Sequence, residues 1–375
     1  MKNLMEGKYG RYILPAVILQ SVLMGGGYTT GREIVEFGAK YGALGWLAGV
    51  AIFAGFTIMS ILMFEFARKF KVFDYRLLVK ELIGPLWFLY DIVYLLLAIL
   101  IIAIIASATG EILGMTLGLN YWVGVILIIA VVGILNFYGK GLIERFKTLG
   151  TVLLMLGYII FAILVISTTW EGAVEVLRSG DTSFMPGKVS ILAVIWTGVL
   201  YVGYNLAVYP AALFTIKRQI SRKDAIIAGF FSGLLMTFPW FLTYISLLGH
   251  YPNEDVLGST VPWLVMLEGF PIIVIVIFGF VVGWTLIETA SGMIHAFIDR
   301  LESQLKDMQS KELNAKQKGG IAVGALILAV LLAQVGIIDL IAKGYTIMAY
   351  GMIIVFALPL LTIGVYKMFF QKEAK

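Results

Sequence analysis

Gly25-Gly26-Gly27-Tyr28-Thr29-Thr30-Gly31 lies in the middle of the first apolar segment of the chain. Each glycine disfavours a helix by roughly 1 kcal/mol relative to alanine, and the β-branched threonines lower helicity further. Within a bilayer, a helix broken here leaves backbone N–H and C=O groups unpaired unless protein, water or a ligand meets them. The stretch therefore predicts a discontinuous membrane helix whose exposed ends bind a substrate and an ion. A glycine-lined contact between unbroken helices is the alternative.

The composition is that of an integral membrane protein. Of the 375 residues, 60% are hydrophobic and only 14% are charged. Apolar runs of roughly 20 residues, the length that spans a bilayer, recur from end to end. We expect an all-α integral membrane protein that forms a single transmembrane domain over residues 1–375. The ten predicted spans are residues 12–38 (interrupted), 44–67, 85–107, 121–137, 148–168, 189–210, 225–248, 271–298, 320–337 and 344–366.

The distribution of lysine and arginine predicts the orientation. With these spans, 23 of the 28 basic residues fall on one side and only Arg32, Lys40, Arg178, Lys188 and Lys343 on the other. Because basic loops stay in the cytoplasm, both termini are predicted to be cytoplasmic, in a multi-pass protein of the plasma membrane. The basic excess therefore reflects topology, and we expect no nucleic-acid partner.

This topology also predicts an internal symmetry. If residues 12–168 and 189–366 are two five-helix repeats, they are inverted relative to each other, as in many secondary transporters. The sixth span is then predicted to be discontinuous like the first. Gly198, Gly203 and Asn205 cluster near its middle, with Tyr201 and Tyr204 beside them. Aromatic packing around one buried asparagine is the alternative.

Two stretches resemble a known family. Gly26-Gly27-Tyr28-Thr29-Thr30-Gly31-Arg32-Glu33-Ile34-Val35-Glu36-Phe37 resembles the GAGFATGxEIxxFF signature of the YkvI-like bacterial membrane proteins, and Leu200-Tyr201-Val202-Gly203-Tyr204-Asn205-Leu206 is similar to their LYxxxN stretch. Gly26, Tyr28 and Thr29 replace Ala, Phe and Ala, which makes this site more polar. The resemblance implies the amino acid–polyamine–organocation superfamily and its LeuT-like fold of ten transmembrane helices, without naming a substrate.

The predicted break suits a zwitterion. The half-helix that begins near Thr29 or Thr30 offers free N–H groups to a carboxylate, and the half that ends near Met24 to Gly26 offers carbonyls to an ammonium group or a cation. The candidate substrate-binding residues come from the first, third and sixth spans: Gly25, Gly26, Gly27, Tyr28, Thr29, Thr30, Tyr94, Tyr201, Gly203, Tyr204 and Asn205.

The eighth span carries a polar stripe. Thr285, Glu288, Thr289, His295 and Asp299 share one helical face, which must contact protein or water rather than lipid. In LeuT-like folds this helix supplies hydroxyl ligands to a sodium ion beside the first break. The resemblance thus implies a sodium site formed by Met24, Gly27, Thr285, Glu288, Thr289 and Ser291. We favour sodium over proton coupling because the fifth span has no internal lysine; no other cofactor is expected.

Charged residues near the ends of the spans are candidate gates. Arg32, Glu33, Glu36 and Asp339 are candidates for an outer gate, and Arg11 with Asp299 for an inner gate. The alternative for these residues is a solvated helix end.

The sequence does not predict an enzyme. The chain has two histidines and no cysteine, and no phosphate-binding loop is present. We expect a cation-coupled secondary transporter of an amino acid or related small zwitterion or amine, whose partners are the lipid bilayer, this substrate and the coupling cation. A ligand-sensing receptor subunit on the same fold, or a transporter of an inorganic cation or neutral solute, are the alternatives. The oligomeric state stays open.

Overall fold

The computed structural model describes residues 7–138, 140–309 and 313–371, and these residues are almost entirely helical. The first segment is divided into short pieces: α2 (Lys8–Tyr12), α3 (Leu14–Leu23), α4 (Gly26–Thr30), α5 (Arg32–Phe37) and the 3₁₀ turn η1 (Ala39–Leu44). Glycine lies at each junction after α3. Eight long helices follow: α6 (Trp46–Phe70), α8 (Trp87–Leu117), α9 (Tyr121–Tyr138), α10 (Lys140–Ser179), α11 (Ile191–Asn205), α13 (Arg222–Leu248), α16 (Ile272–Gln309) and α17 (Ala315–Ala333).

Shorter elements connect and end these helices. They are α7 (Tyr75–Ile83), η2 (Gly84–Leu86), η3 (Leu206–Ala212), α12 (Leu213–Ile216), α14 (Glu254–Leu257) and α15 (Pro262–Leu267). The last segment alternates α and π geometry through α18 (Ile337–Asp339), η4 (Leu340–Tyr345), α19 (Thr346–Met352), η5 (Ile353–Ala357), η6 (Leu360–Gly364) and α20 (Val365–Phe370). Single π turns within helices are frequent at functional sites.

The predicted spans fall on helical segments of the chain. In the described part of the chain, eight helical stretches are long and apolar enough to cross a membrane, and two shorter apolar helices cover Leu14–Leu23 and Tyr121–Leu135. The all-helical membrane fold is therefore confirmed. The two termini themselves, residues 1–6 and 372–375, lie outside the described residues.

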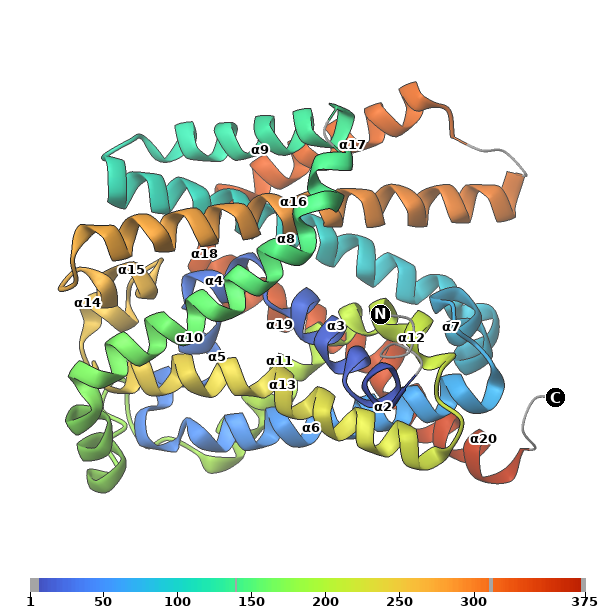
Figure 1. Cartoon of the computed structure of the whole chain (residues 1–375), viewed down its shortest axis with the longest axis horizontal. Coiled ribbons are helices and arrows are strands. Elements are labelled where there is room, and N and C mark those ends of the chain that lie inside the picture. Colours follow the sequence, from blue (N-terminus) through green and yellow to red (C-terminus); the bar gives the residue numbers. More distant parts are fainter. Residues whose placement is uncertain (1–6, 139, 310–312, 372–375) are drawn as a thin grey trace.

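The helices form two groups with the interrupted segment between them. In Figure 1, α8, α9, α16 and α17 lie together on one side, α6 lies along α13 on the other, and α10 crosses obliquely between α13 and α16. Glycine allows the close approach of α13 to α6, because a Cβ on Gly229 would lie 2.7 Å from the backbone nitrogen of Ile61. The pieces α3, α4 and α5 are thus enclosed by both groups.

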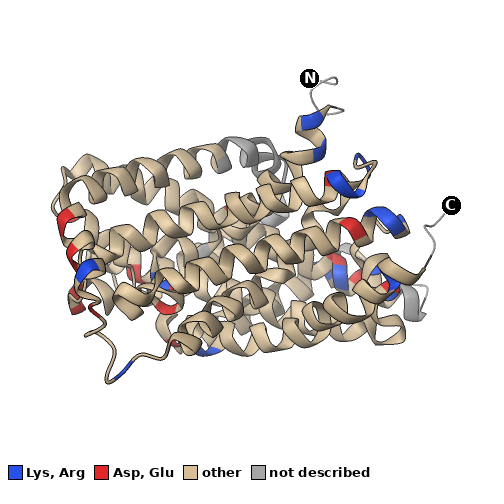
Figure 2. Cartoon of the chain, turned by 90° about the horizontal axis from the view of Figure 1, so that it is seen from below, with Lys and Arg blue, Asp and Glu red and all other residues tan. Residues whose placement is uncertain are grey.

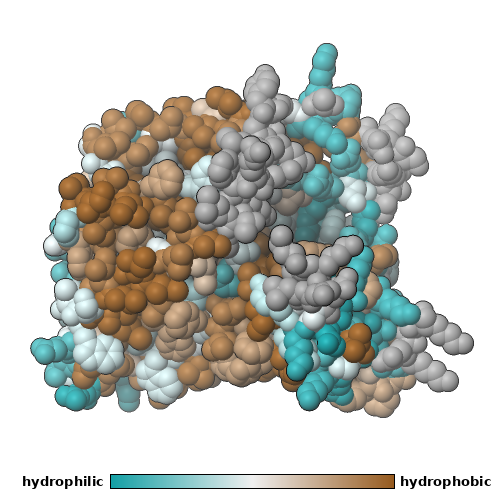
Figure 3. Space-filling model, viewed as in Figure 1, coloured by the Kyte–Doolittle hydropathy of each residue, from teal (hydrophilic) through white to brown (hydrophobic). Residues whose placement is uncertain are grey.

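The surface is that of a protein embedded in lipid. Figure 2 shows lysine and arginine gathered at the end of the bundle where both marked chain ends lie, with few charges midway. In Figure 3 the apolar surface covers the left and centre, and hydrophilic side chains gather at the right. The positive-inside rule, applied to the sequence, predicts that this basic end is cytoplasmic.

Candidate functional site

The first segment is interrupted at the predicted place. After α3, Met24 has ψ 69° and Gly25 is extended (φ −92°, ψ −165°), so the helix stops and α4 begins in a new direction. A second bend follows at Gly31, whose φ of 85° is a left-handed conformation that favours glycine. The unbroken-helix alternative is therefore wrong.

Few local bonds replace the missing helical ones at this break. The N–H of Gly25 donates to the carbonyl of Leu23 (2.8 Å), and the Thr30 hydroxyl donates to the carbonyl of Gly27 (2.8 Å). The Gln20 amide donates to the Met24 sulfur (2.7 Å). Since the first N–H groups of any helix lack intrahelical acceptors, α4 presents backbone donors beside the carbonyls that end α3.

Helix α10 and the outer loop cover α4. The Tyr158 hydroxyl donates to the carbonyl of Tyr28 (3.2 Å), and the two rings lie 5.8 Å apart. Trp263 of α15 packs edge-on against Tyr158, and its side chain approaches Gly31, where a Cβ would lie 3.0 Å from the indole. The rings of Tyr158 and Trp263 therefore cover the break on the side of α10 and α15.

Glu33 occupies the interior of the site, so its predicted place in an outer gate is wrong. The turn at Gly31 directs α5 back toward α4, and the Glu33 side chain is only 4% exposed. Its carboxylate accepts a hydrogen bond from the Tyr204 hydroxyl (2.9 Å) and another from Tyr345. A Cβ placed on Gly27 would lie 2.2 Å from a Glu33 carboxylate oxygen, so this carboxylate fills the space that the glycine leaves.

Aromatic side chains surround this carboxylate. Tyr204 stacks on Tyr345 of the π turn η4 with ring centroids 4.2 Å apart, and Tyr201 and Phe37 pack against Tyr204. The hydroxyls of Tyr28 and Tyr201 are buried, and neither completes a hydrogen bond with the described residues. The Tyr28 hydroxyl does lie beside Thr243. The sequence candidates Tyr28, Tyr201 and Tyr204 thus share one enclosed region with Glu33.

The sixth segment loses α geometry after Asn205 rather than at its glycines. Helix α11 ends at Asn205 and the 3₁₀ stretch η3 follows, containing Pro210. The Asn205 amide donates to the carbonyl of Tyr201 in its own helix (2.8 Å). Gly203 lies within α11 and packs against Ala349 and Ile353.

The polar stripe of α16 reaches the break through Thr289. Its methyl group lies 3.4 Å from the position that a Cβ on Gly25 would take. One turn earlier, the buried Thr285 hydroxyl donates to the carbonyl of Val281 (2.9 Å). A Glu288 carboxylate oxygen approaches Gly150 of α10, and the Ser291 hydroxyl is buried without a hydrogen-bond partner among the described residues.

Arg32, Glu36 and Lys40 form a series of linked charges that runs from the start of α5 into η1, away from the break. Arg32 donates to the carbonyls of Leu257 (2.5 Å) and Ser259 (3.2 Å) in the outer loop. Arg32 also pairs with Glu36 (3.6 Å), which contacts Lys40. These contacts join the outer loop to α5.

Asp339 does not join this outer chain. It pairs with Lys343 (3.0 Å) in its own helix, and both side chains are exposed. Its predicted participation in an outer gate with Arg32 is therefore wrong.

The predicted inner pair is also wrong. Arg11 of α2 pairs with Asp224 (3.7 Å), whereas Asp299 is exposed. Asp224 occupies the first turn of α13 and accepts the N–H groups of Ile220 and Ser221, so its carboxylate is fixed at that helix end. Arg11 thus ties the N-terminal helix to α13.

Tyr94 belongs to a separate cluster rather than to the enclosed region around Glu33. The Arg300 guanidinium lies 3.4 Å from its ring centroid and 4.0 Å from that of Tyr75. Arg300 also pairs with Asp91 (2.8 Å), which is fully buried, and Gln304 donates to the same carboxylate (3.0 Å). This network joins α7, α8 and α16.

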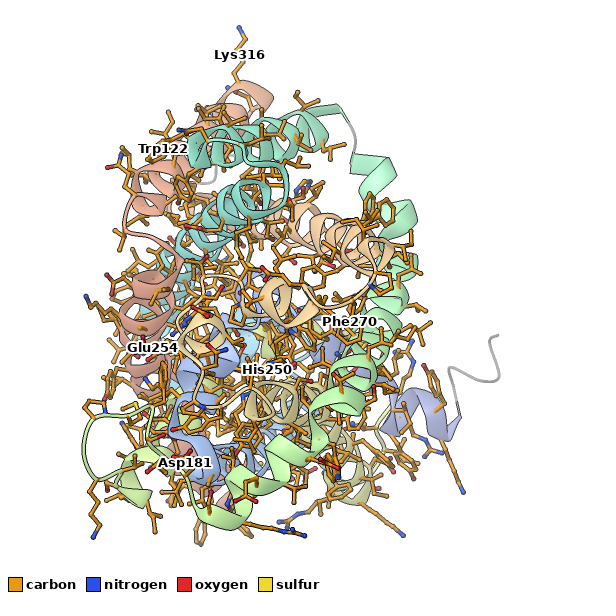
Figure 4. All side chains as sticks on the ribbon, turned by 90° about the vertical axis from the view of Figure 1, so that its left-hand side faces the viewer. Trp122, Asp181, His250, Glu254, Phe270 and Lys316 are labelled. Carbon is orange, nitrogen blue, oxygen red and sulfur yellow. The ribbon has the colours of Figure 1, made fainter. Side chains whose placement is uncertain are left out.

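A cavity of about 540 Å³ opens at the outer end of the molecule. Figure 4 looks onto this end, where Asp181, His250, Glu254 and Phe270 are labelled. The cavity is lined by residues of α8, α14, α15 and the loops beside them: Met115, Phe184, Glu254, Asp255, Gly258, Ser259, Thr260 and Val265. His250 lies on a loop at the same end, and burial lowers the pKa of its imidazole.

Solved structures share this architecture. The chain is similar to the inward-facing conformation of Mhp1, with a TM-score of 0.61 and 16% identity over 96% of this chain and 79% of that one. It is also similar to a manganese transporter of Eremococcus coleocola, with a TM-score of 0.52 and 15% identity over 96% of this chain and 81% of that one. No protein-family model and no curated protein matches the sequence. At this identity the likeness establishes the fold, which is that of the LeuT-type transporters.

Proposed function

We propose that this protein is a cation-coupled secondary transporter of an amino acid or a related small zwitterion or amine, working by alternating access. The observation that carries the proposal is the interrupted first segment, with Thr289 of α16 packed against Gly25 at the break. An interrupted membrane helix places backbone donors and acceptors at mid-depth, where they bind small charged molecules. The YkvI-like family, the inverted repeats 12–168 and 189–366, the ten-helix count and the plasma-membrane location with cytoplasmic termini belong to this proposal.

The substrate site in this proposal lies between α4 and α11. In this proposal, backbone groups of Gly25 to Thr30 line one side of the substrate site. The side chains of Tyr28, Tyr201 and Tyr204 line the other side. Two of these tyrosines have hydroxyls without hydrogen-bond partners among the described residues, as expected for groups that bind a ligand.

Sodium is the favoured coupling ion, and the residues present fit it. Thr285 donates its proton to Val281, which leaves its oxygen lone pairs available to a cation. Thr289 adjoins the break, and the carbonyls of Met24 and Gly27 lie on the interrupted backbone. Glu288 supplies the negative charge on the same helix face. When bound, the ion adds positive charge beside the carbonyl ends of α3.

One ion pair and one pair of hydrogen bonds are placed to open and close access. On the cytoplasmic side, Arg11 and Asp224 hold α2 against α13. On the outer side, Arg32 holds the outer loop to α5. Alternating access requires that these two attachments are not loosened together, since that would open both sides of the site at once.

Uptake by proteoliposomes tests the proposal. The purified protein is reconstituted and presented with the twenty standard amino acids under an inward sodium gradient, a proton gradient or neither. We expect saturable, sodium-dependent uptake of at least one, and a reduced sodium response in Thr289→Val. Thr109→Val is the matched control, because the hydrogen bond that the structure gives the Thr109 hydroxyl stays within its own helix (2.9 Å to the carbonyl of Ile105).

The alternatives give different results in the same assay. Binding without uptake indicates a sensor, and uptake of manganese instead of amino acids indicates an inorganic-cation transporter. In the described ranges, no group of three or more His, Cys, Asp or Glu side chains lies close enough to hold a metal ion. Binding without uptake, or uptake of manganese instead of amino acids, would contradict the proposed function.

A further inference from the structure

Glu33 has a buried carboxyl group that no ion pair among the described residues supplies with a cation. Glu33 is only 4% exposed. Within residues 7–138, 140–309 and 313–371, no lysine or arginine pairs with it, because the adjacent Arg32 is bound to loop carbonyls and to Glu36. A buried carboxyl group stays ionised only when a cation and hydrogen bonds stabilise it, and is otherwise protonated. A cation that binds beside Glu33 would therefore stabilise its ionised form. The two tyrosine hydroxyls supply hydrogen bonds but no charge.

The surroundings of Glu33 favour an organic cation. Ring faces and edges of Tyr201, Tyr204, Tyr345 and Phe37 cluster around the carboxylate, with centroid separations between neighbouring rings of 4.2 to 5.7 Å. Aromatic rings attract ammonium groups through their quadrupoles. A sodium ion instead needs several oxygen ligands, whereas the groups that pack around Tyr204 are the rings of Phe37, Tyr201 and Tyr345.

The position of Glu33 connects it to the interrupted helix. Its carboxylate fills the space left by the absent side chain of Gly27, so it borders the same backbone that the proposed substrate contacts. The unpartnered hydroxyls of Tyr28 and Tyr201 are buried at the same place. A molecule bound at the break would therefore lie next to this carboxyl group and the buried hydroxyls of Tyr28 and Tyr201.

We propose that Glu33 binds the ammonium group of the transported molecule, with Tyr201, Tyr204 and Tyr345 forming an aromatic cage around that group. This rests on the proposed transport function and narrows its substrate class to molecules with a positively charged nitrogen. The substrate's amine is thus recognised by a side chain, and the ammonium is the group that the site requires.

Thermal stability of the purified full chain tests this without transport. Each standard amino acid that stabilises the protein is compared with two derivatives: its N-acetyl form, which lacks the ammonium, and its decarboxylated amine, which lacks the carboxylate. Ligands that bind the folded state raise its melting temperature by mass action. We expect the N-acetyl form to bind at least tenfold more weakly than the amino acid, and the amine to bind more tightly than the N-acetyl form.

Two variants complete the test. Glu33→Gln keeps the shape but removes the charge, and we expect at least a tenfold loss of amino-acid affinity. Glu111→Gln is the matched control, since it removes a half-buried carboxylate that accepts a hydrogen bond from Thr260 (3.1 Å) at the outer end. If Glu33→Gln does not fold, comparing the amino acid, its N-acetyl form and its amine on the wild type still shows whether the site requires an ammonium group.

The outcomes separate this proposal from the transport function. Equal affinity of the N-acetyl form, or unchanged affinity in Glu33→Gln, overturns the role of Glu33 while uptake by the wild type leaves the transport function standing. Stabilisation by sodium alone that is lost in Glu33→Gln also overturns it, because the cation is then a metal ion. If no amino acid binds or is taken up, both proposals fail.

Discussion

Gly27→Ala places a methyl group where the Glu33 carboxylate lies. The new Cβ would be 2.2 Å from a carboxylate oxygen, whereas nonbonded heavy atoms rest at roughly 3.5 Å, so one group must move by about 1 Å. The carboxylate is the more movable group, and its displacement breaks the 2.9 Å hydrogen bond from Tyr204. Hydrogen bonds to charged groups contribute about 1.5–3 kcal/mol, so we expect Gly27→Ala to lower the free energy of unfolding by that amount.

A double-mutant cycle with Glu33→Ala isolates this contact. Removing the carboxylate removes the clash, so Gly27→Ala is expected to be neutral, or stabilising by up to about 1 kcal/mol, when residue 33 is alanine, because alanine is favoured over glycine within a helix. The assay is denaturant unfolding of the four proteins in the same detergent, followed by far-UV circular dichroism. If Gly27→Ala is equally destabilising in both backgrounds, the carboxylate does not occupy the position described here, and the Glu33 site is wrong.

Three further predictions concern other parts of the molecule. Asp91→Asn leaves Arg300 buried without its counter-charge, so we expect destabilisation by about 3–5 kcal/mol in denaturant unfolding, partly restored when Arg300→Gln is added; additive losses would contradict this. Glu288→Gln is expected to abolish the rise in melting temperature produced by sodium chloride over choline chloride, and an unchanged rise would remove Glu288 from the ion site. His250 has a pKa lowered by burial, so the unfolded chain binds its proton more readily. Its contribution is present above about pH 6.5 and is lost as the pH falls through the folded-state pKa. Melting temperatures of His250→Gln from about pH 5 to 8 should therefore fall less on the acid side than those of the wild type, and equal slopes would refute the assignment.

The interruption of the first segment was predictable because its cause is local. Gly25 adopts an extended conformation and Gly31 a left-handed one, and the glycine-rich sequence makes both inexpensive. The membrane spans were predictable for a similar reason, since length and hydropathy alone determine them. The all-helical architecture follows from these spans, because backbone groups in lipid must be satisfied within each helix.

The role of Glu33 was not predictable from local sequence. Glu33 follows Gly31 by two residues, so the direction of its side chain depends on the φ of that glycine. Its partner Tyr345 lies far along the chain, in the π turn η4. A charged residue after a break is equally compatible with a solvated helix end. Only the tertiary structure shows that the side chain turns inward.

The sequence contained a pattern that could have predicted the ion pair of Arg11 with Asp224. Ser221 and Asp224 have the spacing of a helix cap, and the structure shows this capping box at the start of α13. A carboxylate fixed in this way is a ready partner for Arg11. Asp299 stays exposed, so position along the chain alone was a poor guide.

The attachment of Arg32 to the carbonyls of Leu257 and Ser259 makes the outer loop report on the buried helix. Any displacement of α5 is carried to α14, where Glu254 is exposed to the aqueous phase. Because the chain has no cysteine, a single one introduced at Glu254 would take one fluorescent dye without background labelling. The fluorescence of this dye on α14 would then report, in real time, a movement of the buried helix α5, which a dye cannot label directly.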